Sequence, residues 1–426
     1  MKNYYFENNC NVNYCAITGA ASFFAGIRDA IIVINGSRFC YLQMLHHLER
    51  CFRKEIKNRL YCTELKENHI IFGSEEPLKK ILLEVKTNKK ISVIFIQNNC
   101  AASLIGDDLA GIAADIGFDC PIVCLDCGGI QGNFYDGYFM AAKNFFDTLE
   151  LEEQVAEKQL VNIIGVTEGY YNFLHDKEEI ERLLTLGNIK VLNCLAYDIS
   201  LFQIQEMRKA SLNIVIHKEL GEQIAKILYE KYHIPYLILL PPYGIDGSKV
   251  WLTNIMRKIG SSTAELKQIE SIFEHYKQEC AIDMGKLRKS FGELWIDEVD
   301  IAGPYSIVLG LAEALRKELL NYRIMNLYIY SSFDNNKINR FYYHSYSHFP
   351  SNKCQTYIGR KNIFLFASFN EHLTVGIREG GYCCIAYPCN DYVSLGPYMG
   401  VKGHKRLLEK LWQYFIDASI KNISEG

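Results

Sequence analysis

Short runs of apolar, mostly β-branched residues alternate with amphipathic helical stretches along almost the whole chain. A continuous apolar run of this length is typical of a strand buried on both faces, and intervening helices connect such strands in parallel. The runs lie at residues 91–96, 121–125, 160–166, 189–195, 212–216 and 236–240, and the helical stretches at 135–149, 177–186, 201–208 and 219–231. The alternation therefore predicts an α/β fold in which helices cover parallel sheets.

A long charged helical stretch at residues 263–290 separates this series from a second one. The second series comprises strand-like runs at 294–299, 325–330, 363–367 and 382–386, and helical stretches at 305–320 and 405–418. A chain of 426 residues is too long for one core of ordinary size, so two to three domains are expected. We expect an N-terminal α/β domain at residues 1–155, a central Rossmann-like domain at 156–290 and a C-terminal Rossmann-like domain with a closing helix at 291–426. Residues 331–360, rich in Asn, Ser and Tyr, are expected to form a long loop or a small insertion.

Three cysteines, Cys15, Cys40 and Cys100, each stand where an irregular segment gives way to an apolar helix. A thiolate at a helix start is favoured by the positive end of the helix dipole and by unpaired backbone N–H groups. The sulfides of an iron–sulfur cluster would use the same donors. For any one cysteine taken alone, burial as a small hydrophobe is the common alternative.

The composition limits the kinds of partner. A formal charge of -3 gives no basic surface for nucleic acid. The first nine residues are polar, and no apolar run approaches the roughly 20 residues of a membrane span, so a cytoplasmic protein is expected. In that compartment the 15 cysteines would be reduced, which leaves metal binding, catalysis or burial for them.

A fourth cysteine, Cys127, follows a predicted strand and precedes the glycine-rich turn at residues 128–132. Open α/β sheets place their ligands at the carboxyl ends of parallel strands, so Cys127 is a candidate to line a central cavity. The turn is not a P-loop, because no Lys-Ser or Lys-Thr pair follows it. His46 and His47 lie on the helix after Cys40 and are expected to be solvated.

The segments Cys-Ala-Ile-Thr-Gly-Ala (15–20), Asn-Gly-Ser-Arg-Phe-Cys (35–40) and Cys-Ala-Ala-Ser-Leu-Ile-Gly-Asp-Asp (100–108) resemble the three cluster-ligand segments of the nitrogenase component 1 family. Their cysteines are 25 and 60 residues apart, in an order and separation that also fit that family. The family includes the nitrogenase molybdenum-iron protein subunits, their cofactor-assembly scaffold relatives and the dark-operative protochlorophyllide and related tetrapyrrole reductases. Further similarity at residues 161–165, 232–245 and 396–403 extends the resemblance over nearly the whole chain.

The resemblance implies three Rossmann-like domains and a cluster at the interface with a like subunit. Cys15, Cys40 and Cys100 would bind iron there, either in a [4Fe-4S] cluster completed by the partner or in a larger fused cluster. The partner would be a homologous or identical component 1-type subunit, in a homo- or heterodimer or a tetramer. An ATP-dependent reductase iron–sulfur protein is the expected electron donor, in agreement with the lack of a Walker motif in this chain.

Two further positions concern a second metal–sulfur cofactor. His217 falls where the catalytic nitrogenase subunit has the cysteine that holds the iron–molybdenum cofactor. Imidazole binds iron, so His217 is either a metal ligand or a polar histidine at the end of a strand. The family's cofactor-binding histidine near the carboxyl terminus has no match here, and Cys389 lies in its neighbourhood.

The resemblance therefore predicts an iron–sulfur subunit of a nitrogenase-like two-component reductase, with its substrate or metal cofactor in an interdomain cavity. His217, Cys127 and Cys389 are the cavity candidates. Two alternatives remain at this point. The chain would be a scaffold for assembling and transferring a complex cofactor, or a non-catalytic partner that holds half of the interfacial cluster.

Overall fold

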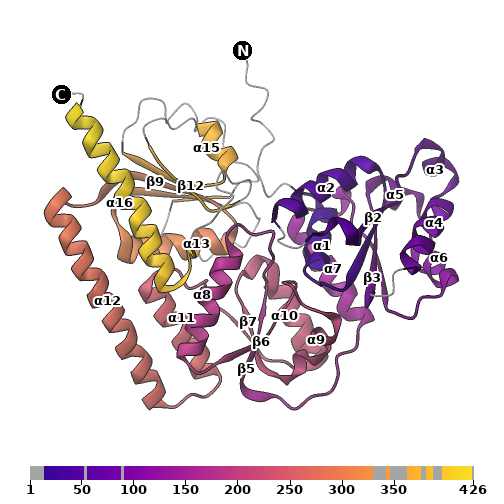
Figure 1. Ribbon diagram of the computed structural model, residues 1–426, viewed down its shortest axis with the longest axis horizontal. Coiled ribbons are helices and arrows are strands. Elements are labelled where there is room, and N and C mark those ends of the chain that lie inside the picture. The colour runs from indigo at the N-terminus through magenta and orange to yellow at the C-terminus, as the bar shows by residue number, and fades with distance from the viewer. Residues whose placement is uncertain are drawn as a thin grey trace.

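The computed structural model describes residues 14–51, 55–87, 91–329, 342–345, 362–375, 380–386 and 396–424. These residues build three parallel sheets with helices packed around each (Figure 1). The strand orders are β2-β1-β3-β4, β6-β5-β7-β8 and β11-β10-β9-β12-β13. All pairings between the described strands are parallel, which confirms the expected α/β class. The domain boundaries near residues 155 and 290 stay a prediction.

The first sheet carries the three cysteines at its carboxyl edge. Its strand β1 is buried at every residue, as the run of Ile and Val predicts. The elements of this part are α1 (Ala16–Ala25), β1 (Ala30–Asn35), α2 (Arg38–Cys51), the 3₁₀ turn η1 (Lys57–Arg59), β2 (Leu60–Cys62), α3 (Glu67–Phe72), α4 (Glu75–Lys86), β3 (Val93–Asn98), α5 (Cys100–Ile105), α6 (Leu109–Ile116), β4 (Ile122–Asp126), the 3₁₀ turn η2 (Gly129–Gln131) and α7 (Phe134–Thr148). The helix that begins at Cys100 ends at Ile105, because Gly106 adopts a left-handed conformation and Asp108 then caps α6.

Glycines let α1 and α7 cross at very short range. A Cβ on Gly19 would lie 1.8 Å from the backbone oxygen of Phe134, and one on Gly137 would lie 1.8 Å from the backbone oxygen of Ala16. No other residue fits at either position without moving a helix. The close crossing therefore fixes the start of α1, where Cys15 lies, against α7.

The second sheet lies below the first part in the chosen view (Figure 1). Its elements are β5 (Glu157–Ile164), α8 (Phe173–Leu186), β6 (Lys190–Cys194), α9 (Leu201–Gln205), the 3₁₀ turn η3 (Glu206–Lys209), β7 (Ala210–Val215), α10 (Lys218–Tyr232), β8 (Tyr236–Ile238), α11 (Ile245–Lys258) and α12 (Thr263–Phe291). Ser262 begins the long helix α12 with a capping box to Glu265, which explains why the charged stretch starts there.

The third sheet completes the chain. Its elements are β9 (Trp295–Gly303), α13 (Tyr305–Ala314), a π-helical turn η4 (Leu315–Leu319), β10 (Asn321–Ile329), β11 (Tyr342–Ser345), β12 (Ile363–Ala367), α15 (Phe369–Val375), β13 (Gly381–Cys384) and α16 (Gly400–Ser424). The predicted loop or insertion at residues 331–360 thus contains one strand, and its remaining residues lie outside the described part. No helix within the described ranges has both the length and the apolar character needed to span a membrane.

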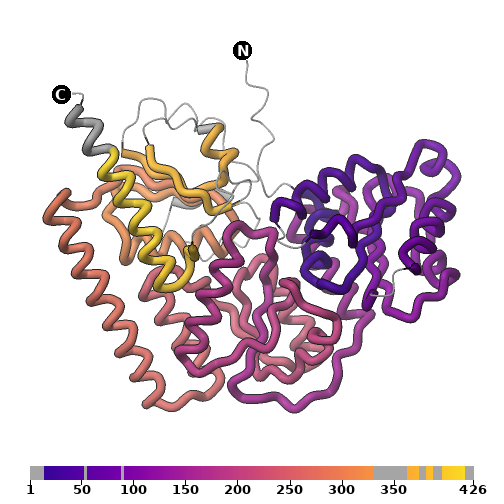
Figure 2. The backbone as a smooth tube through the Cα atoms, in the orientation of Figure 1, coloured from indigo at the N-terminus to yellow at the C-terminus, as the bar shows by residue number. Residues whose placement is uncertain are grey.

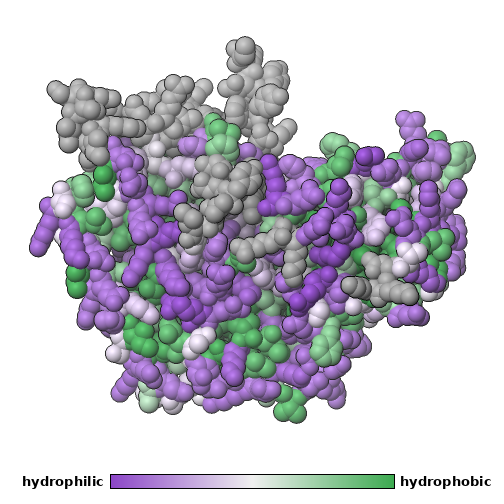
Figure 3. All heavy atoms as spheres, viewed as in Figure 1, coloured by the Kyte–Doolittle hydropathy of each residue, from purple (hydrophilic) through white to green (hydrophobic). Residues whose placement is uncertain are grey.

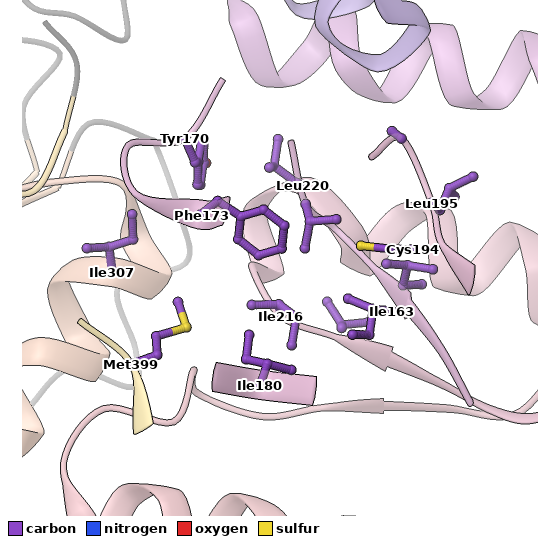
Figure 4. Packing of buried hydrophobic residues seen from close by; sticks show 14 of the residues in the cluster. Ile163, Tyr170, Phe173, Ile180, Cys194, Leu195, Ile216, Leu220, Ile307 and Met399 are labelled. Carbon is purple, nitrogen blue, oxygen red and sulfur yellow. The ribbon is translucent and has the colours of Figure 1, made fainter. Parts of the chain in front are cut away.

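One hydrophobic cluster runs through all three parts of the chain, and the first part lies to one side of the other two (Figure 2). Figure 4 shows Ile307 and Met399 beside Tyr170, Phe173 and Ile180. All five residues are buried. Burial of this apolar surface holds the two sheets together at the edge where the strands of the second sheet end.

A buried carboxylate joins the same two parts. Oδ1 of Asp176 in α8 accepts hydrogen bonds from the backbone N–H of Tyr398 (2.6 Å) and Met399 (2.8 Å), directly before α16. Burial raises the pKa of Asp176 to about 7, although these two N–H groups and the Arg406 guanidinium oppose the shift. Because this folded-state pKa exceeds the usual 3.8, the folded protein holds the proton longer than the unfolded chain.

We expect Asp176→Asn to flatten the pH dependence of stability. In the wild type, the contribution of Asp176 is fully present below about pH 4 and is lost as the pH rises to about 7, on the order of 4 kcal/mol at most. The asparagine keeps an oxygen acceptor for both N–H groups but has no charge to bury. Urea denaturation between pH 4 and 8 measures the difference, with Asp283→Asn on the exposed face of α12 as the control. An unchanged slope in the Asp176 variant would contradict this account.

Candidate functional site

Cys15 is half-buried at the N-cap of α1. Burial raises the pKa of its thiol, the backbone N–H groups of Ile17 and Thr18 oppose that shift, and negative charge on Cys100 or Cys40 adds to it. The N–H groups at this helix start favour a thiolate, although the Cys15 side chain accepts no cap hydrogen bond. Cys15 thus lies within electrostatic range of Cys40 and Cys100.

The glycine turn after β4 brings Cys100 and Cys15 together. The backbone N–H of Gly129 donates to Cys100 Sγ over 2.9 Å. A Cβ on Gly129 would lie 3.5 Å from Cys100 Sγ and 3.8 Å from Cys15 Sγ, so both sulfurs surround one point. The sequence indicated only that this turn is not a P-loop, because its place against the cysteines depends on strands distant in sequence.

Cys40 is the third residue of α2 and lies against the residue before Cys100. Its Sγ is 3.6 Å from Ser37 Oγ and 3.6 Å from Asn99 Nδ2. Asn99 also caps α5, whose first residue is Cys100. The structure thus brings Cys15, Cys40 and Cys100 to the same edge of the first sheet, while their role as ligands stays a prediction.

These residues suit a multi-iron group better than a single ion. No three His, Cys, Asp or Glu side chains within the described ranges are arranged to hold one metal ion. The cysteines of an iron–sulfur cluster bind different irons, so their sulfurs lie farther apart than the ligands of one ion. Half-buried thiols at two helix starts and one first turn, with a backbone N–H aimed at a sulfur, fit such a cluster.

Cys127 lies beside these cysteines rather than in a central cavity. Its side chain is fully buried, and its Sγ donates to Gln97 Oε1 over 3.3 Å. Burial raises the pKa of the thiol, and charge on Cys15 or Cys100 would raise it further. Cys127 is therefore a neutral thiol behind the cluster segments. Cys389 lies outside the described residues.

A pocket lies where the three parts of the chain meet. The part of the chain around the first sheet contributes aromatic side chains to this pocket. The part around the second sheet contributes the turn after β5, and the part around the third sheet contributes residues that follow β9 and β13. The lining residues are Tyr14, His47, Phe134, Gly169, Tyr170, Tyr171, Pro304, Ile307, Ile385 and Ala386. None of these described residues carries an acidic or strongly basic side chain.

His47 belongs to this pocket, so its expected solvation is wrong. The ring is 5% exposed and lies with its centroid 4.2 Å from that of Tyr14. Burial lowers the pKa of His47 to about 3, which keeps the imidazole neutral. On α2 the inner face includes Met44, Leu48 and His47, whereas His46 is exposed. Adjacent residues of a helix point to different faces, so only one of these two histidines can face the core.

His217 lies behind the pocket at the N-cap of α10. It is 1% exposed, and its Nδ1 lies 3.0 Å from the backbone oxygen of Gly165. The carbonyl can only accept, so Nδ1 carries the proton and Nε2 keeps its lone pair. Burial lowers the pKa of His217 to about 3. The His217 ring packs against the ring of Tyr170, and the two ring centroids are 4.7 Å apart. Tyr170 in turn lines the pocket.

The family model described as "Nitrogenase component 1 type Oxidoreductase" matches residues 15–319. The chain belongs to this family. The match begins at Cys15 and includes Cys40, Cys100, His47 and His217. The resemblance inferred from the cysteine segments is confirmed.

Curated relatives of this component 1-type chain carry two kinds of name. The nitrogenase iron-molybdenum cofactor biosynthesis protein NifE of Nostoc sp. is 28% identical over 230 residues, which are 53% of this chain and 46% of NifE. The nitrogenase molybdenum-iron protein alpha chain of Methanosarcina barkeri is 24% identical over 284 residues, 65% of this chain and 53% of that one. The component 1-type chain thus matches only about half the length of these relatives.

A solved structure titled "Nitrogenase Cp1 at pH 6.5" has the same fold. It superposes with a TM-score of 0.78 and covers 95% of this component 1-type chain and 93% of the solved one. A second, "Nitrogenase Cp1 at pH 5", gives a TM-score of 0.71. Their sequence identities are 14% and 18%, so these likenesses concern the fold alone.

Proposed function

We propose that this chain is the iron–sulfur subunit of a nitrogenase-like two-component reductase. The proposal depends on one observation, the common neighbourhood of the three cysteines: Cys15 and Cys100 lie around Gly129, and Cys40 lies against Asn99, the residue before Cys100. These three thiolates would hold a [4Fe-4S] or larger fused cluster, which supplies one-electron redox chemistry when bound. The backbone N–H groups there would stabilise the negative charge of the sulfurs.

The proposal includes a partner chain of the same type. Three cysteines are one short of the usual four ligands of a cubane cluster, so the partner would complete the site. Apolar side chains beside the cysteines are unusually exposed and would be covered by that partner. They are Phe39 (74%), Leu104 (79%) and Ile130 (62%), together with Ile71 (74%) and Phe72 (86%) on α3, which contacts α5. Most of the face shown in Figure 3 is hydrophilic, with smaller apolar areas, some of them on the N-terminal part.

Electrons would come from an ATP-hydrolysing iron–sulfur protein and be used in the interdomain pocket. The pocket has a cavity volume of about 30 Å³, so its aromatic side chains would shield only a very small substrate from water. Its histidine, His47, and the histidine behind it, His217, are both neutral because they are buried. The described lining residues are uncharged, which favours an uncharged substrate, because an anion would lack a compensating charge among them. The cytoplasmic location stays a prediction.

Anaerobic reconstitution with iron and sulfide tests the proposal. We expect about four irons per pair of chains, or about eight for a fused cluster, with an electron paramagnetic resonance signal after reduction. Turnover would then require a nitrogenase-type reductase and ATP. A protein that remains colourless and iron-free after reconstitution, both alone and with a candidate partner chain, would contradict the proposal.

The scaffold function is the second candidate, because several curated relatives are named cofactor biosynthesis proteins. No described residue of the pocket lining is cationic, which argues against it, since a complex metal–sulfur cofactor is anionic and needs cationic residues nearby. A scaffold would retain a second cluster and pass it to an acceptor protein, whereas a reductase would turn over substrate. A non-catalytic partner would do neither.

A charge placed in the exposed apolar surface should separate the two chains. Leu104 is 79% exposed and lies one turn after Cys100, so Leu104→Arg should leave the fold intact and weaken pairing at least about tenfold. Analytical ultracentrifugation measures the pairing. Ile282→Arg on α12, which is 61% exposed and distant in sequence, is the control. Equal pairing by both variants would place the interface elsewhere.

A further inference from the structure

A single buried amide connects two of the three cysteines. Asn99 is 3% exposed and directly precedes Cys100. Its Nδ2 donates to Cys40 Sγ over 3.6 Å, and its Oδ1 accepts from the backbone N–H of Ala102 over 2.9 Å. The oxygen thus caps the helix that starts at Cys100, while the nitrogen contacts the other cysteine.

The orientation of this amide follows from its partners. The Ala102 N–H can only donate, so the atom of Asn99 that faces it must be the oxygen. The NH₂ group then necessarily faces Cys40, where a thiolate accepts. Reversing the amide would place two donors against each other at the helix cap and an oxygen lone pair against a thiolate.

The surrounding residues fix the position of the Asn99 side-chain amide. A Cβ on Gly36 would lie 2.5 Å from Asn99 Cγ and 2.7 Å from Nδ2, so only glycine admits the amide there. The backbone N–H of Asn99 donates to the Asn35 carbonyl over 3.1 Å. The Asn35 side chain is in turn hydrogen bonded to Ser74 and Asn98. The donor is therefore held before any cluster binds.

We propose that Asn99 is a positioning residue that holds Cys40 relative to Cys100 and makes the group they bind easier to reduce. The inference rests on the proposed function, because it concerns an iron–sulfur group held by these thiolates. Hydrogen bonds to the sulfurs of such a group stabilise the more negative, reduced state and thereby raise its reduction potential. The Gly129 N–H acts in the same sense on Cys100, and the Ser37 hydroxyl does so on Cys40, but Asn99 is the donor that also caps the helix starting at Cys100.

Three variants separate the two roles of the amide. Asn99→Asp and Asn99→Ser both keep an oxygen that can cap α5, and both lose the N–H donor. Asn99→Asp also adds a negative charge, whereas Asn99→Ser does not. Asn99→Ala loses both the cap and the donor. Asn133→Asp is the control for the added charge. Asn133 is the N-cap of α7 beside Cys15, and its Oδ1 accepts from the N–H groups of Tyr135 and Asp136, so an aspartate there keeps the cap and adds one negative charge.

Redox titration followed by electron paramagnetic resonance is the measurement, on the reconstituted protein with its partner chain. We expect a more negative midpoint potential in Asn99→Ser, a larger negative shift in Asn99→Asp, and a smaller one in Asn133→Asp. Iron content should stay near wild type in Asn99→Ser and fall severalfold in Asn99→Ala.

The outcomes distinguish this inference from the proposed function. A wild-type chain that binds no iron would refute the proposed function. A wild-type cluster whose potential is unchanged in both Asn99→Ser and Asn99→Asp would overturn the role of Asn99 alone. The midpoint potential could also shift equally in Asn133→Asp and Asn99→Asp and not at all in Asn99→Ser. Added negative charge alone would then explain the shifts, and the proposed role of Asn99 would again be overturned.

Discussion

Alanine at Cys15, Cys40 or Cys100 should lower iron binding at least tenfold while the fold is kept. Each thiol is half-buried at or near the start of a helix, so its removal leaves no large cavity and no unpaired charge. A cluster that lacks one of its thiolates loses a covalent ligand. Iron and sulfide analysis after reconstitution, together with visible absorbance, measures the loss.

A cysteine of similar exposure provides the control. Cys120 is half-buried and packs against the outer hydrophobic cluster of the first sheet, among Ile94, Leu109 and Ile112. Cys120→Ala should therefore bind iron as the wild type does. If all four alanine variants bind iron equally, these three cysteines are not the ligands. If Cys40→Ala retains iron and the Cys15 and Cys100 variants lose it, Cys40 is not a ligand and the cluster is bound by Cys15 and Cys100.

Gly137→Ala should strongly destabilise the first part of the chain. Its Cβ would lie 1.8 Å from the Ala16 carbonyl oxygen and 2.4 Å from the carbonyl carbon, and both are backbone atoms that cannot rotate away. Helices α1 and α7 would have to separate, at a cost on the order of 3 kcal/mol or more. Because Ala16 follows Cys15, iron binding should fall as well. Thermal and urea denaturation measure the stability.

Gly285→Ala is the matched control for that substitution. Gly285 lies inside the long helix α12, and a Cβ there would meet nothing within 4 Å. Alanine should stabilise this helix by about 0.5–1 kcal/mol, because glycine loses more backbone entropy on folding. Similar small effects of both substitutions would show that α1 and α7 can adjust, and that their crossing does not fix Cys15.

The helix boundaries show where local sequence was sufficient and where it was not. Strand β1 and helix α12 follow directly from a buried run of Ile and Val and from a capping box beginning at Ser262. The helix expected at residues 305–320 instead changes to a π-helical turn at residue 315. In that turn Glu318 accepts from the N–H groups of Ile245 and Asp246, a contact between the second and third sheets. A long-range hydrogen bond of this kind has no local sequence pattern.

The sequence by itself determined the α/β class and the three cysteine segments, because apolar periodicity and residue spacing are local properties of a chain. Only the tertiary structure placed the Gly129 N–H and the Asn99 amide on the sulfurs, buried His47 in the pocket and put Cys127 behind the cluster segments. These arrangements depend on which strand edges and helix faces meet, and residues far apart in the chain decide that together. Burial and hydrogen-bond partners, which set the chemistry of each side chain, exist only once the sheets have packed.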